Sequence, residues 1–305
     1  MSLVMKVFKS FFNLLVVLLL VITIIFLIAR LFPGDIITVL YGETASIDGA
    51  RNVVGSRLGL DKPLHIQLLM FLKNVFTGNW GISIFSGEPV ILRVFKSFVN
   101  SLALALLATV TTTVFSIILA YIAFTGKCWR LATALASISS AMPTAIWGLL
   151  LMALLVALRV KMPLGPIVMP LATLTLAGAG TFYAILKGLV DNAMSEQFVD
   201  LYNALGFPRH RIFIRVLRYV APAYIVALIY RMGLIIAGAI ATEALFQYPG
   251  MGMLLLDAFS SRDYPVLIGW GVMVSATLAA LNLVGDVLQS FLDPRLRDLH
   301  WVRHW

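Results

Sequence analysis

Two charged residues stand in or beside an apolar stretch that is long enough to cross a membrane. Arg231 falls near the middle of the run from Val220 to Thr242, and Glu243 follows its end. A charge at the centre of a bilayer costs at least about 2.5 kcal/mol, so something must compensate it. Arg231 could contact an anionic group such as a substrate carboxylate, or else a partner subunit or a backbone carbonyl. For Glu243 we favour a structural partner over a substrate, because a charge near the membrane boundary costs much less.

A second set of polar residues fills the interval from Lys187 to Pro222, the longest cation-rich segment between two apolar runs. Ser195 is expected to cap a short helix that ends at Gly206, since glycine suits the left-handed conformation that often follows a helix. Pro208 then suits the first turn of a second helix. That second helix carries four arginines, namely Arg209, Arg211, Arg215 and Arg218. A short helix held by a glycine turn can fit a groove on another protein.

The sequence contains none of the residue patterns that would indicate an enzyme. It has no His-Glu-x-x-His, no Gly-x-Ser-x-Gly and no phosphate-binding Gly-x-x-x-x-Gly-Lys-[Ser/Thr] pattern. His300 and His304 have helical spacing, but two histidines on a short tail lack the third ligand of a metal site. Cys128 is the only cysteine, which excludes an intrachain disulfide and a cysteine cluster. We therefore expect neither a catalytic site nor a metal site.

The composition is that of an integral membrane protein. Hydrophobic residues make up 61% of the chain and charged residues only 12%, whereas an ordinary soluble domain is roughly 25% charged. The formal net charge of +9 is explained by cations that flank apolar spans, and no arginine-rich tract or alternation of basic and aromatic residues accompanies it. Nucleic acid is therefore excluded as a partner, and the lipid membrane is expected to be one.

Six apolar runs are long enough to span a bilayer, since a spanning helix needs about 20 residues. They are Phe11 to Ala29, Phe98 to Phe124, Leu131 to Leu158, Met162 to Leu186, Val220 to Thr242 and Val266 to Leu292. Prolines such as Pro143 break or bound the third and fourth runs. The sequence thus predicts an all-α membrane protein with six transmembrane helices.

Lysines and arginines in the short loops set the orientation, because the cytoplasmic side carries the excess. This distribution places both termini in the cytoplasm. Residues 1–30 are then an N-terminal segment with the first helix, and residues 31–97 a small extracytoplasmic cap. Residues 98–292 form a core of five helices with a cytosolic loop at about 187–219, and residues 293–305 form a cytosolic tail.

The cytosolic loop contains the segment Glu196-Gln-Phe-Val-Asp-Leu-Tyr-Asn-Ala-Leu-Gly206. It resembles the coupling loop of a family, the permease subunits of bacterial ABC importers for oligopeptides, dipeptides and nickel, specifically the B member of the permease pair. Further blocks follow in the order of that family, namely Leu31-Phe-Pro-Gly-Asp35, Leu58-Gly-Leu-Asp-Lys-Pro-Leu64, Gly78-Asn-Trp-Gly-Ile-Ser83, Tyr248-Pro-Gly-Met-Gly252, Arg262-Asp-Tyr-Pro-Val266 and Asp293-Pro-Arg295. The resemblance covers nearly the whole chain.

The resemblance implies the type I importer permease fold in the bacterial inner membrane. It also implies a second permease as heterodimer partner, two cytosolic ATPases that use ATP and magnesium, and an extracytoplasmic binding protein that delivers the substrate. This chain itself would bind no cofactor. The residues that would couple it to the ATPases are Glu196, Asp200, Ala204, Gly206, Arg209, Arg211 and Arg215, and the candidates for the pore are Arg231 and Glu243.

The substrate class and one competing class of protein stay open at this point. Peptides are the first expectation, and nickel, a metal chelate or a glutathione-like solute is the alternative. A self-sufficient channel or secondary transporter is the competing class, but it would need ion-coupling residues inside the spans. Apart from Arg231, the spans contain almost no interior charge.

Overall fold

The computed structural model describes residues 62–126, 128–159 and 165–292, together with helical pieces between residues 8 and 27. These parts of the chain are helical apart from turns and one isolated bridge between Ile82 and Pro89. Residues 31–61 of the expected cap, the centre of the short loop at 160–164 and the tail at 293–305 with both its histidines lie outside the described residues.

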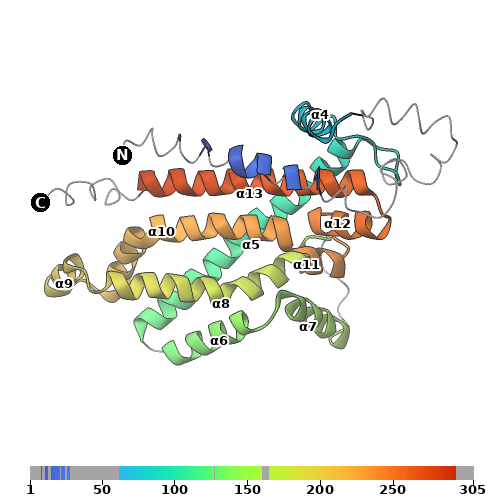
Figure 1. Cartoon of the computed structure of the whole chain (residues 1–305). Coiled ribbons are helices and arrows are strands. Elements are labelled where there is room, and N and C mark those ends of the chain that lie inside the picture. The colour runs from blue at the N-terminus through green and yellow to red at the C-terminus, as the bar shows by residue number, and fades with distance from the viewer. Residues whose placement is uncertain are drawn as a thin grey trace, which may run out of the picture.

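Four long apolar helices dominate the described part of the chain (Figure 1). They are α5 (Val90–Thr125), α8 (Val168–Ala193), α10 (Arg209–Gly238) and α13 (Tyr264–Leu292). Each is long and apolar enough to span a membrane. With 36 residues, α5 is about 54 Å long, well above the roughly 30 Å of a hydrocarbon core. It accordingly runs obliquely to α8, α10 and α13 in Figure 1.

The third predicted span, Leu131 to Leu158, is a bent pair of helices. The pair consists of α6 (Trp129–Ala141) and α7 (Thr144–Ala157), which meet at an angle of 105°. Pro143 causes the break, because it has no amide hydrogen and forces Met142 into an extended conformation with ψ of 130°. With this pair counted as one span, the described residues contain up to five spans.

The sixth predicted span, Val266 to Leu292, agrees closely with α13 (Tyr264–Leu292), whereas other boundaries differ by several residues. The fourth span is α8, which begins at Val168 and continues past the expected end to Ala193. The fifth is the membrane part of α10, which ends at Gly238 and is followed by the short helix α11 (Ile240–Leu245). The first span falls on residues that are described only in pieces, which are helical.

Short helices cluster at the two ends of the bundle. At one end lies α9 (Gln197–Ala204), and at the other lie α4 (Leu64–Phe76), α11 and α12 (Met251–Ser260) (Figure 1). Three buried apolar clusters follow one another along the bundle, centred on residues such as Leu186, Leu104 and Val94. The short helices at both ends therefore pack onto one helical framework.

The bent pair packs tightly against α8 at a glycine. A Cβ atom on Gly180 would lie 2.0 Å from the carbonyl oxygen of Ala136. The amide of Gly180 donates to the Ser139 hydroxyl at 2.8 Å, and this hydroxyl donates to the carbonyl of Leu176. Small residues permit such close approach between helices in membranes. Gly180 is thus required where α6 crosses α8.

We expect Gly180→Ala to destabilise the packing of α6 on α8 by about 1–3 kcal/mol, because backbone atoms would have to move apart. The measurement is the midpoint of thermal unfolding of the purified protein in detergent. Gly188→Ala is the matched control, since it lies on the same helix and its added Cβ would meet nothing within 4 Å. Equal midpoints for the two variants would contradict the close approach.

Candidate functional site

The turn between α9 and α10 is built around Gly206. This residue has a φ of +72°, in the left-handed region that glycine adopts without strain. Its amide donates to the carbonyl of Asn203, and the amide of Phe207 donates to the carbonyl of Tyr202, both at 3.0 Å. The Tyr202 and Phe207 rings pack with centroids 5.2 Å apart. These two bonds and the apolar contact form a Schellman motif, which confirms Gly206 as the end of the short helix.

The start of α9 differs from the prediction. Glu196 occupies the cap position, and Ser195 directs its hydroxyl back to the carbonyl of Asn192 at 2.7 Å. The prediction of Ser195 as N-cap is therefore wrong, because its hydroxyl satisfies the end of the preceding helix. Pro208 occupies the cap position of α10, and its carbonyl accepts the amide of Arg211 at 2.9 Å. The prediction for Pro208 is thus correct to within one residue.

Three side-chain contacts hold α9 against α10. Arg215 donates to the hydroxyl of Tyr202 at 2.7 Å, and its guanidinium carbon lies 4.4 Å from the centre of that ring. One turn further on, Tyr219 donates to the carboxylate of Glu196 at 2.8 Å. The ring of Phe198 packs on Tyr219 with centroids 5.0 Å apart. Arg215 and Glu196 therefore fix the orientation of α9 relative to α10.

The remaining residues of the predicted coupling set are accessible to solvent. Asp200, Ala204, Gly206, Arg209 and Arg211 are all exposed. Arg209 also donates to the carbonyl of Thr125 at 3.3 Å, which ties the start of α10 to the end of α5. The outer face of α9 is thus polar and small at most of its positions.

The sequence analysis missed two leucines on this face. Leu201 on α9 is 57% exposed, and Leu205, the residue that caps the C-terminal end of this helix, is 63% exposed. Their separation by four residues places them on the same side of α9, and this spacing was the signal available in the sequence. These two leucines are therefore the apolar side chains available for a contact on the outer side of α9.

Arg231 lies inside the helical bundle and is only 8% exposed. Its Nη2 donates to the carbonyl of Leu174 at 2.8 Å, and its guanidinium carbon lies 4.8 Å from the centre of the Phe182 ring. A Cβ atom on Gly178 would lie 2.0 Å from Nη2, so the side chain rests directly on the backbone of α8. Nη1 is buried and has no hydrogen-bond partner among the described residues.

Glu243 caps the first turn of α12. Its side chain is fully buried and accepts the amides of Gly252 at 2.6 Å and Met253 at 3.3 Å. The hydroxyl of Ser101 on α5 donates to the same carboxyl at 2.6 Å and accepts the amide of Met251 at 2.7 Å. Together, the two side chains satisfy three amides that a helix start leaves without partners. Glu243 therefore has a structural role, because it joins the start of α12 to α5.

Two segments far apart in the sequence meet at Asp263. Its carboxylate accepts the hydroxyl of Ser83 at 2.5 Å and the amide of Ile84 at 3.2 Å, and Arg93 lies 3.4 Å away. Both Asp263 and Ser83 are buried. Nothing in the sequence alone predicts this contact, because a pairing across 180 positions leaves no local signal.

Comparison with known proteins places this architecture in a family. A family model described as "Binding-protein-dependent transport system inner membrane component" matches residues 112–298, and the model for the N-terminal part of such components matches residues 3–105.

Several relatives are similar over most of their length. The di/tripeptide transport system permease protein DppB of Pseudomonas aeruginosa is 30% identical over 89% of this chain and 92% of its own. The glutathione transport system permease protein GsiC of Salmonella typhimurium is 28% identical over 95% of this chain and 98% of its own. The metal-staphylopine import system permease protein CntB of Staphylococcus aureus is 26% identical over 79% of this chain and 81% of its own.

We expect Glu243→Ala to lower the stability of the protein by about 2 kcal/mol or more, because it leaves buried amides of α12 without acceptors. The thermal unfolding midpoint in detergent measures this effect. Asp257→Ala is the control, since Asp257 is exposed on the same helix. If the two variants unfold at the same temperature, Glu243 does not stabilise the start of α12.

Proposed function

The chain belongs to the family of inner membrane components of binding-protein-dependent transport systems, and we propose that it forms half of the translocation pore of an ATP-driven peptide importer. It is a multi-pass inner membrane protein and a permease subunit of an ABC importer. One observation supports the proposed coupling. The helix α9 has an exposed outer face, and hydrogen bonds from Arg215 and Tyr219 hold it to the spanning helix α10.

The proposed energy source is a pair of separate ATPase subunits. The sequence has no phosphate-binding loop, so this chain binds no cofactor in the proposal, and ATP and magnesium are used by the partners. Closure of the ATPases on ATP would move α9, with Leu201 and Leu205 seated in a groove of the ATPase. Because α9 is clamped to α10, its movement biases the spanning helices toward one of two states.

The proposed topology has six spanning helices with both termini in the cytoplasm. The segment 187–219 is then the cytosolic coupling loop, and residues 31–97 lie outside the membrane, where a substrate-binding protein docks. The second half of the pore is a different permease subunit. Exposed apolar side chains along α5, such as Leu106, Val110 and Val114, suit contact with lipid or with that second subunit.

The proposed substrate is a peptide. Relatives named for di/tripeptides, for glutathione and for metal-staphylopine support this class and keep glutathione-like solutes and metal chelates as the alternative. A self-sufficient channel or secondary transporter is disfavoured, because Arg231 is already held by the Leu174 carbonyl and the Phe182 ring and the spans offer few other groups for ion coupling.

The test is purification of the complex from its native membrane in mild detergent, followed by mass spectrometry of the proteins that accompany the chain. We expect a second permease and two P-loop ATPases. Recovery of this chain alone, in a state that transports a solute without ATP, would exclude the importer and indicate a channel or secondary carrier.

We expect Leu201→Ser combined with Leu205→Ser to lower the amount of co-purified ATPase about tenfold or more, because apolar anchors contribute most to such contacts. ATP-dependent uptake should fall in parallel while the chain stays in the membrane. Leu69→Ser is the control, since Leu69 is 63% exposed on α4 at the other end of the bundle. Undiminished ATPase recovery in the double variant would argue against α9 as the coupling helix.

Arg231 supports a further prediction about the substrate. Its Nη2 and ring contacts hold the side chain in place, whereas the buried Nη1 offers a donor to a carboxylate in a state that opens the bundle. We expect Arg231→Gln to weaken uptake of peptides with a free C-terminal carboxylate more than uptake of their amidated forms. The measurement is the uptake rate of both peptide forms by the variant. Equal losses of uptake for the two forms would indicate that Arg231 has a purely structural role.

A further inference from the structure

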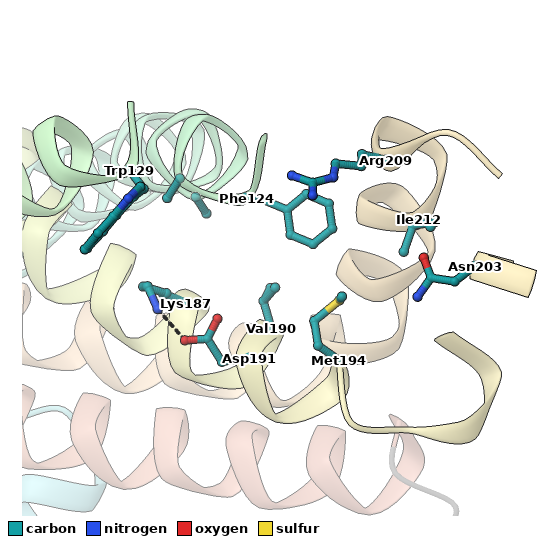
Figure 2. Close-up of a pocket in the computed structure, with 11 residues that line it drawn as sticks. Phe124, Trp129, Lys187, Val190, Asp191, Met194, Asn203, Arg209 and Ile212 are labelled. Carbon is teal, nitrogen blue, oxygen red and sulfur yellow. Dashed lines mark hydrogen bonds and ion pairs between the residues drawn. The ribbon is translucent and has the colours of Figure 1, made fainter. Parts of the chain in front are cut away.

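A cavity of about 490 Å³ lies beside α9, where the ends of five helices converge (Figure 2). Its walls come from the end of α5, the start of α6, the end of α8, one residue of α9 and the start of α10. Apolar side chains, among them Phe124, Val190 and Ile212, line its inner part. Lys187 on α8 and Arg209 on α10 lie on opposite walls in Figure 2. The cavity thus combines an apolar interior with cationic walls.

The cations of this cavity retain capacity to bind an anion. Lys187 forms an ion pair with Asp191, in which both side chains are partly exposed, at 40% and 58%. The one hydrogen bond described for the Arg209 side chain goes to the Thr125 carbonyl, and a guanidinium has five donors. Lys187 and Arg209 contribute two positive charges and Asp191 one negative charge, so the cavity walls have a net positive charge.

The wall formed by α6 has the character of a membrane interface. Trp129, the first residue of α6, is 51% exposed, and tryptophan is enriched where apolar chains meet polar headgroups. Arg130 lies 5.5 Å from the centre of the Trp129 ring. Among the described residues, no side chain caps the start of α6, which leaves amide donors of its first turn beside the cavity.

We propose that this cavity binds the phosphate of an anionic glycerophospholipid. Arginine and lysine are the residues that bind phosphate oxygens, and basic pockets between spanning helices on the cytoplasmic side suit anionic headgroups. The apolar interior and Trp129 favour a lipid over a soluble phosphate compound, because a lipid also buries its glycerol and the start of its acyl chains. The bound lipid joins α5, α6, α8 and α10 next to the helix α9. This inference rests on the residues that line the cavity. The proposed transport function is used only to place the cavity on the cytoplasmic side of the membrane.

The Lys187–Asp191 ion pair allows lipid binding to be distinguished from a purely structural role. A phosphate that binds Lys187 competes with the Asp191 carboxylate for the same ammonium group. Asp191→Asn removes the competitor and one negative charge, and the exposed position tolerates the change. Removal of a merely structural ion pair would not strengthen lipid binding, so a gain of affinity distinguishes the two roles.

The experiment measures binding of phosphatidylglycerol to the delipidated permease complex in detergent, by native mass spectrometry and by titration. We expect Lys187→Gln combined with Arg209→Gln to weaken binding about tenfold or more, since the phosphate would lose both of its cationic partners in the cavity. We expect Asp191→Asn to strengthen it. Arg211→Gln is the matched control, because Arg211 is exposed on the same turn of α10 and does not line the cavity.

Two further arms identify the ligand. Phosphatidylcholine should bind more weakly than phosphatidylglycerol, and inorganic phosphate at millimolar concentration should not displace the lipid. Displacement by inorganic phosphate would assign the site to a soluble phosphate and overturn the lipid assignment. Unchanged phosphatidylglycerol affinity in the double variant, with its helical circular dichroism spectrum intact, would overturn the site. Lipid binding is read without any transport assay, so this proposal and the proposed function fail independently.

Discussion

The structure depends on one constraint, that a backbone polar group inside an apolar bundle must find its partner within the protein. Long helices meet this requirement by themselves, and the irregular segments meet it through a few side chains. Glu243 and Ser101 accept the free amides of α12, and Asp263 accepts the amide of Ile84. Each of these side chains also joins elements that are distant in sequence. The same contacts that satisfy the backbone therefore hold the short helices and turns to the long ones.

The two ends of the bundle meet this constraint differently. At the end that carries α12, buried carboxylates bind amides, and the segments are enclosed by α5 and α13. At the end that carries α9, the backbone closes on itself through the left-handed Gly206, and the side chains that hold the turn are partly exposed. Because the turn at Gly206 is closed by its own backbone hydrogen bonds, the outer face of α9 is available to contact another protein. At the α12 end, by contrast, the buried carboxylates tie the short segments to the long helices.

Local features of the fold could be predicted from the sequence, and long-range ones could not. Apolar length predicted the long helices α5, α8, α10 and α13, and Gly206 predicted the end of α9, because both features depend on neighbouring residues. Pro143 marked a break, but its angle of 105° depends on how α7 packs. Ser195 was misassigned because its hydroxyl found a nearer acceptor in the preceding helix. The pairing of Asp263 with Ser83 was not predictable, since hydrogen bonds between distant segments leave no periodic pattern in one sequence.

The helix α10 links the exposed turn to the buried interior of the bundle. It has 30 residues and is therefore about 45 Å long. Arg215 and Tyr219 clamp its first turns to α9, whereas Arg231 attaches its later part to the carbonyl of Leu174 on α8. Pro222 lies between these attachments and removes one backbone hydrogen bond, so α10 bends most easily there. In the proposed importer, a displacement of α9 would therefore move the first part of α10 directly, and it would reach Arg231 through the weakened segment at Pro222.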